Sequence, residues 1–388
     1  MLYFLFKPFT LPSSWRGTPE QRLVPLCDSL GATLAETVKS CTDVPPYSLA
    51  LRDGWAVRTD DPLPRQVKLP AVVNGEVPGA LGYAEAVWVN TGGMLPPRAD
   101  AVIADDHDAP EHLQDEAVEG RHVLHRGADW QRGEVVLEKG TEIGASEHAM
   151  LLEAGIERVP VCLPPTVGIV ATGNELIELG CRTPASPKRC SSNTCYLRSL
   201  FLRLGIRRVN VRMTDDDPDA IADALKTLAA TCSFLITIGG TGKGSRDVTR
   251  SAVRKAGGKL SQSALCADKT PPFIAGSLDG IPLIGLPGNP LGAVMIAQRV
   301  IVPLLWERTH MTPYRPRTVT ARFEGEIDEA ATGDLCVNLV DAEGTLLAVP
   351  VQKGTGRARL FRETAGTVCL KEQTLSRGEF VTVECFAN

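Results

Sequence analysis

The sequence lacks the patterned cysteines of zinc sites and disulfide-rich scaffolds. Its 388 residues include 11 cysteines, an odd number, and no two of them form a Cys-x-x-Cys pair. Structural zinc sites and the disulfide frameworks of small secreted domains both depend on matched cysteine spacings. The scattered cysteines therefore favour reduced thiols in a cytosolic protein and argue against a zinc site.

An excess of positive charge and a long N-terminal hydrophobic run are also missing. The chain carries 41 basic and 46 acidic residues, for a formal net charge of −5. Nucleic acids and anionic membranes attract basic surfaces, so neither is an expected partner. The apolar run at residues 2–6 is too short for a signal sequence or a membrane span. Export is therefore not indicated, and we expect a cytoplasmic protein.

A glycine-rich loop after a buried strand is the central feature of the sequence. Residues 234–238 form a short apolar run with a β-branched bias, which predicts a strand of a parallel sheet. The following loop consists of Gly239, Gly240, Thr241, Gly242, Lys243 and Gly244. Such glycines bring backbone N–H groups close to a phosphate where a strand passes into a helix, although a tight turn needs glycine too. Asp247 then holds a metal ion or caps the helix expected over residues 248–256.

Two further strands are expected to end in polar, glycine-bearing loops. Residues 167–171 precede the sequence Thr-Gly-Asn-Glu-Leu at residues 172–176. Residues 283–285 precede Leu-Pro-Gly-Asn-Pro at residues 286–290. Ligands of open parallel sheets lie in the crevice at the carboxyl ends of the strands. We expect the three loops to meet there.

The length predicts two to four domains. Strands and helices alternate over residues 165–310, which predicts a doubly wound α/β domain with right-handed crossovers. Short, Pro-, Gly- and Val-rich runs over residues 46–124 predict an inserted small β domain, and residues 311–388 predict a second one. The remaining residues, 1–45 and 125–164, form a discontinuous N-terminal linking domain in this scheme.

Several helices are expected from their ends and their apolar spacing. Asn193 is expected to cap a helix that Gly205 closes, and Asp217-Pro218 opens another. Pro290 starts a longer helix that is apolar nearly all round, so we expect it to be buried against the sheet or a partner chain. Leucines at i, i+4 spacing suggest partial helix over residues 23–37, although Pro25 and Gly31 interrupt the pattern.

An ordered set of motifs resembles one known family. Asp-Val-Pro-Pro at 43–46, Arg-Asp-Gly-Trp-Ala-Val at 52–57, Thr-Gly-Gly-Met-Leu-Pro at 91–96 and Ala-Asp-Ala-Val at 99–102 resemble N-terminal motifs of the molybdopterin molybdenumtransferases, the MoeA and gephyrin E-domain family. Residues 172–176, Ser192-Asn193, the loop at 239–247 and residues 286–290 continue the match in the same order. Single motifs are weak signals, but the resemblance covers nearly the whole chain.

The resemblance implies a four-part subunit that forms a homodimer. Its site would lie between the α/β domain and the inserted β domain of the partner. The family takes adenylylated molybdopterin and molybdate, releases AMP, and leaves molybdenum on the dithiolene, with a divalent ion such as Mg²⁺. A client molybdenum enzyme is a further expected partner.

The resemblance also implies site residues. It gives catalytic roles to Asp53, Glu175 and Asp247, and metal ligation to Asp53, Asp100 and Asp247. Structural alternatives exist for each: a turn former for Asp53, a loop salt bridge for Asp100, and helix capping or a first-turn charge for the other two. The substrate-binding positions are Thr91, Gly92, Thr172, Gly173, Ser192, Asn193, Gly239, Gly240, Thr241, Gly242, Lys243, Gly244, Pro287, Gly288, Asn289 and Pro290.

The chain also departs from the family pattern. The family's Asp-Asn-Ser-Ala-Met-Asp-Gly-Tyr is Ser-Leu-Ala-Leu-Arg-Asp-Gly-Trp at residues 48–55, and Ser191 replaces an aspartate. The family's Lys-Pro-Gly-Lys-Pro corresponds to Asp-Lys-Thr-Pro-Pro at residues 268–272, so two cations are lost from their expected places. The Gly-Gly-Thr-Gly loop is closer to that of molybdopterin adenylyltransferases. Molybdenum insertion, adenylyl transfer and a catalytically degenerate cofactor carrier therefore remain as hypotheses.

Overall fold

The computed structural model describes residues 3–4, 19–105, 111–177, 187–241, 248–261, 273–351 and 357–387. Backbone contacts divide the chain into two compact units. One unit consists of residues 21–161, and the other of residues 1–20 together with 162–388. The expected division into four domains is finer than this and stays a prediction.

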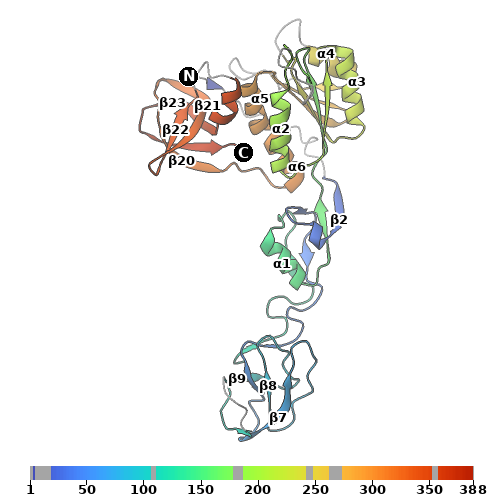
Figure 1. The fold of residues 1–388 in the computed structure, drawn as a ribbon, viewed down its shortest axis with the longest axis vertical. Helices are drawn as coiled ribbons and strands as arrows, with labels where there is room; N and C mark the ends of the chain where they lie inside the picture. Colours follow the sequence, from blue (N-terminus) through green and yellow to red (C-terminus); the bar gives the residue numbers. More distant parts are fainter. Residues whose placement is uncertain are drawn as a thin grey trace. The chain divides into compact units, whose positions relative to one another are not determined.

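The unit of residues 21–161 contains a five-stranded sheet in the order β10-β7-β8-β6-β9 (Figure 1). Its strands are β6 (Gly54–Val57), β7 (Arg65–Val72), β8 (Glu85–Val89), β9 (Ala101–Ala104) and β10 (His112–Leu113). Strand β6 is buried along its whole length, with Trp55 and Val57 in one apolar cluster and Ala56 in another. This sheet lies within residues 46–124, where the sequence predicts a small β domain.

The rest of this unit is built from short strands and one helix. A three-stranded sheet consists of β2 (Gln21–Pro25), β13 (Arg158–Cys162) and β3 (Thr33–Leu34). Helix α1 (Ala145–Glu153) shares an apolar cluster with this sheet. Two further strand pairs join β4 (Val38–Lys39) to β12 (Val135–Leu137) and β5 (Leu49–Ala50) to β11 (Val123–Leu124).

The partial helix expected over residues 23–37 is wrong. This stretch forms β2, a single 3₁₀ turn at Leu26–Asp28 and β3. Pro25 has no N–H to donate and Gly31 turns the chain at φ +76°, so an α-helix cannot continue through either position. Leu26 and Leu34 pack in one cluster with Ile143, but Leu30 between them is exposed, so the leucine spacing does not mark a helix face.

The second unit is centred on a six-stranded sheet in the order β15-β14-β16-β19-β18-β17. Its strands are β14 (Val167–Thr172), β15 (Val209–Thr214), β16 (Phe234–Ile238), β17 (Lys259–Leu260), β18 (Ile274–Leu278) and β19 (Ile281–Leu286). The four strands β15, β14, β16 and β19 are parallel, and β18 and β17 continue the sheet in antiparallel pairing. The three predicted strands are confirmed, and the sheet is mixed at one edge.

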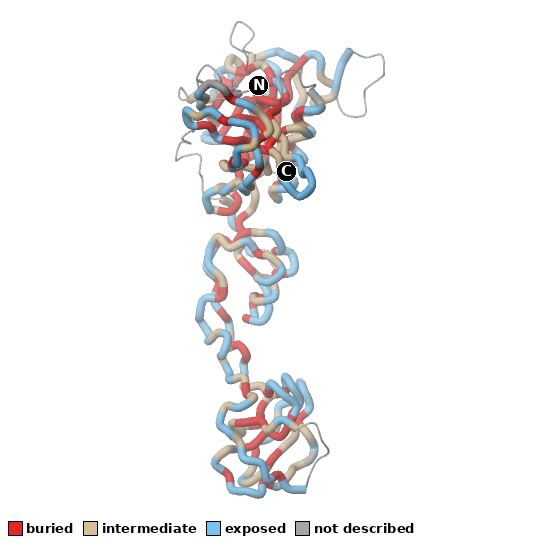
Figure 2. Tube along the Cα trace, turned by 90° about the vertical axis from the view of Figure 1, so that its left-hand side faces the viewer, coloured by how far each residue is buried: buried red, intermediate tan, exposed pale blue. Residues whose placement is uncertain are grey.

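Helices cover both faces of this sheet, as the alternation of strands and helices predicts (Figure 1). Helices α3 (Pro218–Ala229) and α4 (Val248–Lys255) pack with Val170 and Leu235 on one face. Helix α2 (Ser192–Arg203) and the helix that starts at Pro290 pack on the other face. The central strands are buried on both sides, and the buried residues gather in the interior of the unit (Figure 2).

The long apolar helix has a widened turn in its middle. It runs through α5 (Pro290–Ile296), a π-helical turn (Ala297–Ile301) and α6 (Val302–His310). Pro303 explains the widening, because its ring clashes with the carbonyl four residues earlier, that of Arg299. The helix is long and apolar enough to cross a membrane, but 78% of its apolar window is buried inside the protein. The sequence predicts that this helix is buried against the sheet or against a partner chain, and it is buried against the sheet.

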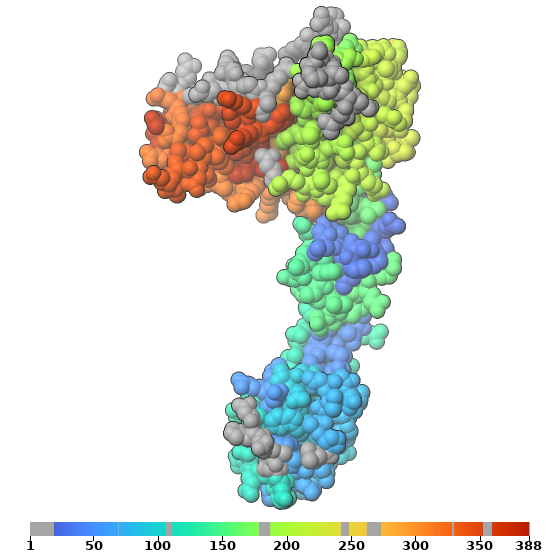
Figure 3. All heavy atoms as spheres, in the orientation of Figure 1, coloured from blue at the N-terminus to red at the C-terminus, as the bar shows by residue number. Residues whose placement is uncertain are grey.

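The C-terminal β domain is a nearly closed ring of strands. Strands β20 (Thr318–Phe323), β21 (Ile327–Ala342), β22 (Thr345–Pro350), β23 (Gly366–Leu375) and β24 (Phe380–Cys385) pair in the order β21-β22-β20-β24-β23, and β23 pairs back to β21. Helix α7 (Arg357–Glu363) lies beside them and packs against α5. In the space-filling view these residues, in orange and red, lie directly against the α/β domain (Figure 3).

One strand of this domain comes from the opposite end of the chain. Strand β1 (Tyr3–Phe4) pairs with β21, with Tyr3 opposite Leu335. These two residues therefore belong to the C-terminal sheet rather than to the expected linking domain. A two-residue strand has no sequence pattern that names its partner, so this pairing is decided by tertiary structure.

Candidate functional site

Three loops meet at one edge of the central sheet, as predicted. Ala171 of β14 pairs with Ile238 of β16, and Ile238 pairs with Leu286 of β19, so the three strands end at the same level. The backbone N–H of Gly239 donates to the carbonyl of Leu286 at 2.9 Å. A cavity of about 60 Å³ lies between the loops, and we call it the loop-edge cavity. It is lined by Thr172, Glu175, Leu176, Arg189, Cys190, Ser191, Ser192, Asn193, Ile238, Gly239, Gly288 and Pro290.

Two positions of the glycine loop admit no side chain. Gly239 has φ +101°, and a Cβ there would lie 2.7 Å from the carbonyl oxygen of Thr172. Gly240 has φ +65°, and a Cβ would lie 2.5 Å from Oγ1 of Thr249. The Thr249 hydroxyl donates to the carbonyl of Gly239 at 2.9 Å, which ties the loop to the first turn of α4. The backbone therefore packs tightly against the end of β14 and the start of α4, and Gly239 also lines the loop-edge cavity.

The remaining loop residues are only partly described. Thr241 is buried beside Gly240. Gly242, Lys243, Gly244 and Asp247 lie outside the described residues, so the cationic and metal-binding roles expected at Lys243 and Asp247 stay predictions. The helix expected after them is confirmed as α4, from Val248 to Lys255.

Helix α2 begins two residues earlier than expected. Its cap is Ser191, whose hydroxyl accepts the backbone N–H of Thr194 at 3.3 Å. Asn193 lies inside the first turn, where its side chain is buried and cannot act as the cap. Serine and asparagine are both good caps, so spacing alone does not separate the two positions. The end of the helix is as expected, because Gly205 follows it at φ +77°.

Asn193 points into the loop-edge cavity and is only half satisfied. Its side-chain amide nitrogen donates to the carbonyl of Gly288 at 3.2 Å. Its amide oxygen is buried and has no hydrogen-bond partner among the described residues. A buried polar atom without a partner is costly, and such atoms often mark a ligand position. The Asn193 oxygen is therefore available to a donor group on a bound ligand.

The loop after β19 is shaped by its own helix start. Asn289 caps α5 by accepting the backbone N–H of Leu291 at 3.3 Å, and Pro290 occupies the first helical position. The predicted residues Gly288 and Pro290 line the loop-edge cavity. Pro287 and Asn289 do not appear in its lining, and Asn289 has the structural role of a helix cap.

The last residue of β14 and the residues after it take part in several polar contacts. The Thr172 hydroxyl donates to Oδ1 of Asp216 at 2.6 Å, and Gly173 donates its N–H to the carbonyl of Thr214 at 3.1 Å. Glu175 pairs with Arg189 at 3.0 Å, and both side chains are about half exposed, 48% each. An exposed pair of this kind contributes little to stability, so Glu175 remains accessible for chemistry.

Asp216 and Arg189 were missed in the sequence. Asp216 follows the edge strand β15, within the run of aspartates at residues 215–217. A run of acids directly after a parallel strand is a usable signal, because it must lie at the same edge as the other loops. Arg189 has no such signal, since its partner Glu175 is 14 residues away in the connection between β14 and α2 and no spacing rule links the two.

The predicted acidic residues of the other unit are engaged with threonines. Asp53 accepts both the backbone N–H of Thr91 at 2.6 Å and its hydroxyl at 2.8 Å. The backbone hydrogen bond, and then the side-chain one, hold the pKa of Asp53 below its ordinary value, so the carboxylate is charged. Gly92 continues this turn by donating to the carbonyl of Ala50 at 2.8 Å.

Asp100 has a structural contact of its own. Its two carboxylate oxygens accept the backbone N–H and the hydroxyl of Thr59, at 2.8 and 3.0 Å. The structural alternative expected for Asp100 is a salt bridge within a loop. The observed bonding is of this structural kind, but the partner is a threonine and not a basic residue. No group of three or more His, Cys, Asp or Glu side chains that could hold a metal is found within the described parts of the chain. Within those parts, a Mg²⁺ ion would therefore find at most two such side chains together and would need phosphate oxygens from a ligand as well.

Comparison with known proteins identifies the family. Residues 7–155 match the MoeA N-terminal region (domains I and II), and residues 168–307 match the probable molybdopterin binding domain. The molybdopterin molybdenumtransferase of Haemophilus influenzae is 27% identical over 282 residues, 70% of this chain and 69% of that protein. That of Bacillus subtilis is 27% identical over 353 residues, 86% of this chain and 81% of that protein.

A solved structure agrees over the whole chain. The molybdopterin biosynthesis MoeA protein of a Pyrococcus species superposes with a TM-score of 0.82 at 28% identity, covering 96% of this chain and 95% of that one. The first match contains the five-stranded sheet, and the second contains the α/β domain with its three-loop edge; the C-terminal β domain follows both matched segments. The chain therefore belongs to the molybdopterin molybdenumtransferase (MoeA) family, as a divergent member.

Proposed function

We propose that this protein is a molybdopterin molybdenumtransferase of molybdenum cofactor biosynthesis. It takes adenylylated molybdopterin and molybdate, cleaves the link to the adenylyl group with release of AMP, and leaves molybdenum on the dithiolene. The observation that carries the proposal is the loop-edge cavity, where Glu175, Gly239 and Gly288 from the three loops line one space with Asn193 of α2. The relatives named for this activity support it.

The proposed roles follow from the chemistry of each group. Backbone N–H groups of the glycine loop hold the phosphates, and Lys243 contributes a positive charge. The buried oxygen of Asn193 accepts a hydrogen bond from the substrate. Glu175 and Asp247 act on the reacting phosphate, and Asp53 supplies a charged carboxylate.

We further propose that Mg²⁺ binds with the substrate. A hard cation favours carboxylate and phosphate oxygens, which matches Asp53, Asp100 and Asp247 as ligands. The protein would act as a cytoplasmic homodimer in which each site combines residues of two subunits, and it would deliver its product to a client molybdenum enzyme. Dimer formation is tested by light scattering of the purified chain.

The decisive experiment is AMP release from adenylylated molybdopterin with Mg²⁺. Release that depends on added molybdate supports the transferase, and its absence with authentic substrate contradicts it. Consumption of ATP in the presence of molybdopterin would identify an adenylyltransferase instead. Tight substrate binding with neither reaction would identify a cofactor carrier, a role consistent with the lost family residues at positions 48, 49 and 191.

A further inference from the structure

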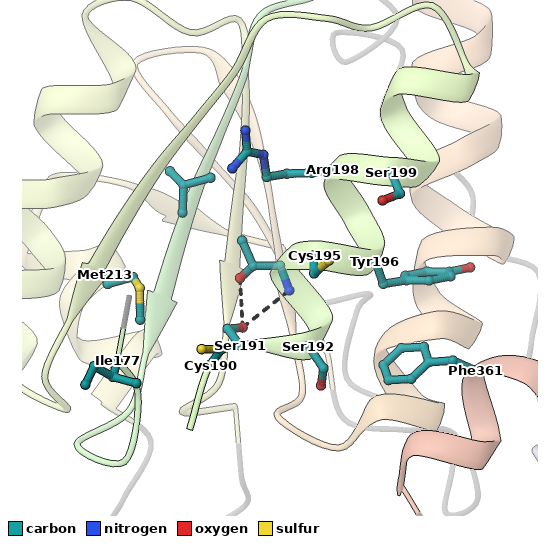
Figure 4. A pocket seen from close by; sticks show the side chains of 12 residues that line it. Ile177, Cys190, Ser191, Ser192, Cys195, Tyr196, Arg198, Ser199, Met213 and Phe361 are labelled. Carbon is teal, nitrogen blue, oxygen red and sulfur yellow. Dashed lines mark hydrogen bonds between the residues drawn. The ribbon is translucent and has the colours of Figure 1, made fainter. Parts of the chain in front are cut away.

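A second, larger cavity adjoins the loop-edge cavity. Its volume is about 950 Å³, and it is formed by the outer face of α2, the edge strand β15 and helix α7 (Figure 4). Cys190, Ser191 and Ser192 line both cavities, so the two cavities are neighbours at the start of α2. We call it the α2 cavity.

The walls of the α2 cavity are apolar and aromatic. Ile177 and Met213 lie on one side of it, and Tyr196 and Phe361 lie on the other (Figure 4). The Tyr196 and Phe361 rings have centroids 5.4 Å apart and are tilted by 35°. The side-chain amide of Gln298 donates to the Tyr196 hydroxyl at 2.8 Å, which holds that ring in place. Fixed aromatic rings and a thioether are good contacts for a flat, polarisable ring system.

The polar groups of the α2 cavity are few and are suited to a heterocycle. Ser199 and Arg198 lie on α2 and line the same space. Hydroxyl and guanidinium groups bind ring nitrogens and exocyclic oxygens, and a guanidinium also stacks on aromatic faces. A cavity of this size with apolar walls and a few convergent polar groups is typical of small-molecule sites.

We propose that the α2 cavity binds a flat nitrogen heterocycle of the substrate while the substrate phosphates lie in the loop-edge cavity. The proposal rests on the proposed function, because adenylylated molybdopterin carries two such rings, a pterin and an adenine, joined through phosphates. Cys190, Ser191 and Ser192 border both cavities, so a molecule that spans the start of α2 would occupy both. The two rings share the required chemistry, and experiment separates them.

The first test fills the cavity in the full-length chain. Ser199 is exposed and lines the α2 cavity, so Ser199→Trp places an indole in it without removing a buried contact. Leu202→Trp is the matched control, because Leu202 is exposed on the same helix and does not line the cavity. Titration calorimetry uses AMP, unsubstituted pterin and inorganic pyrophosphate as probes.

Ser199→Trp is expected to weaken binding of one ring probe by about tenfold or more, a loss readily resolved by calorimetry. Pyrophosphate affinity should stay unchanged in both variants, and Leu202→Trp should bind all three probes like the wild type. The ring that loses affinity is the one that the cavity holds. Unchanged ring affinity in Ser199→Trp, or no binding of either ring probe to the wild type, overturns the proposal.

The second test needs no variant. Cys195 lines the α2 cavity, and Cys369 is an exposed cysteine in the C-terminal domain. Addition of the ring probe that binds, AMP or pterin, should slow the alkylation of Cys195 by iodoacetamide. The alkylation rate of Cys369 should not change. Equal alkylation rates of Cys195 with and without both rings contradict the proposal. Molybdate-dependent AMP release tests the proposed function separately. If a ring protects Cys195 but no AMP is released, only the proposed transferase activity is contradicted. If AMP is released but neither ring protects Cys195, only the proposed role of the α2 cavity is contradicted.

Discussion

Asn193 in the first turn of α2 donates its side-chain amide to the main-chain carbonyl of Gly288 at 3.2 Å, across 95 residues of sequence. This bond joins the helix at the edge of the loop-edge cavity to the loop that follows β19. It leaves the Asn193 oxygen buried and without a partner among the described residues. The same side chain therefore holds α2 to this loop and has an unused acceptor oxygen at the loop-edge cavity.

Asn193→Ala should reduce both stability and substrate binding. Loss of the amide leaves the Gly288 carbonyl without this donor, so the free energy of unfolding should fall by about 1–3 kcal/mol. Urea denaturation measures the change, and calorimetry with adenylylated molybdopterin measures affinity. Asn210→Ala is the control, because Asn210 is exposed in the same domain. Full affinity in Asn193→Ala would mean that its oxygen faces no ligand.

Two glycines of the site should respond differently to alanine. Gly240→Ala should lower stability by about 1–3 kcal/mol, because φ is +65° and Oγ1 of Thr249 lies 2.5 Å from the new Cβ. A Cβ at Gly288 meets nothing within 4 Å, so Gly288→Ala should keep the stability of the wild type. Its methyl group lines the loop-edge cavity and should weaken pyrophosphate binding. Thermal unfolding with calorimetry tests both, and unchanged pyrophosphate affinity in Gly288→Ala would place the phosphates elsewhere.

Asp53 should stay ionised at unusually low pH. Hydrogen bonds from the N–H and hydroxyl of Thr91 lower its pKa in the folded protein relative to the ordinary value of 3.8. The ionised Asp53 therefore stabilises the folded protein at pH values above 3.8. This stabilisation is lost as the pH falls through the pKa of Asp53 in the folded state, which lies below 3.8. A carboxylate NMR titration measures the midpoint. Thr91→Val removes only the hydroxyl bond and should raise the pKa part of the way; no change would show that the backbone bond acts alone.

The ion pairs of Arg299 should stabilise the packing of the α/β domain against the C-terminal domain. It contacts Asp334 at 2.7 Å and also pairs with Glu384, and its side chain is 19% exposed. Burial opposes its charge, but the two carboxylates outweigh burial and raise the pKa of Arg299. Arg299→Met leaves Asp334 buried without this partner, so stability should fall by about 3–5 kcal/mol.

A surface pair provides the comparison for Arg299. Arg377 contacts Glu324 at 2.8 Å with 77% of its side chain exposed. Arg377→Met should therefore cost about 1 kcal/mol or less, since exposed pairs contribute little. Guanidinium denaturation of both variants measures the difference. Equal losses would show that burial of the Arg299 pairs does not determine their contribution.

Tyr196 should titrate above the exposed tyrosines. Burial raises its pKa to about 12, against a smaller opposing effect of the Gln298 hydrogen bond. The pKa of Tyr196 in the folded state lies above the unfolded value of about 10, so the folded state favours the protonated phenol. The stability that this preference contributes is complete below about pH 10 and is lost between about pH 10 and pH 12. Absorbance titration near 295 nm should show a late step that Tyr196→Phe removes. Persistence of that step in the variant would assign it to another tyrosine.

Much of the α/β domain could be predicted from sequence because its signals are local. The apolar runs that become β14, β16 and β19 each end in a glycine-bearing loop, and parallel pairing places those ends at one edge. Asp217 and Pro218 start α3 as expected, because a cap and a first-turn proline act within a few residues.

In the α/β domain, the sequence by itself determined the main strands and helices and which loops converge, because apolar periodicity and turn residues act over short stretches of chain. Only the tertiary structure decided which side chains meet: Asn193 with Gly288, Glu175 with Arg189, Arg299 with Asp334, and β1 with β21. Such contacts depend on packing between distant segments, and no local pattern names the partner. The α2 cavity is of the same kind, since α2, β15 and α7 line it from three separate parts of the chain.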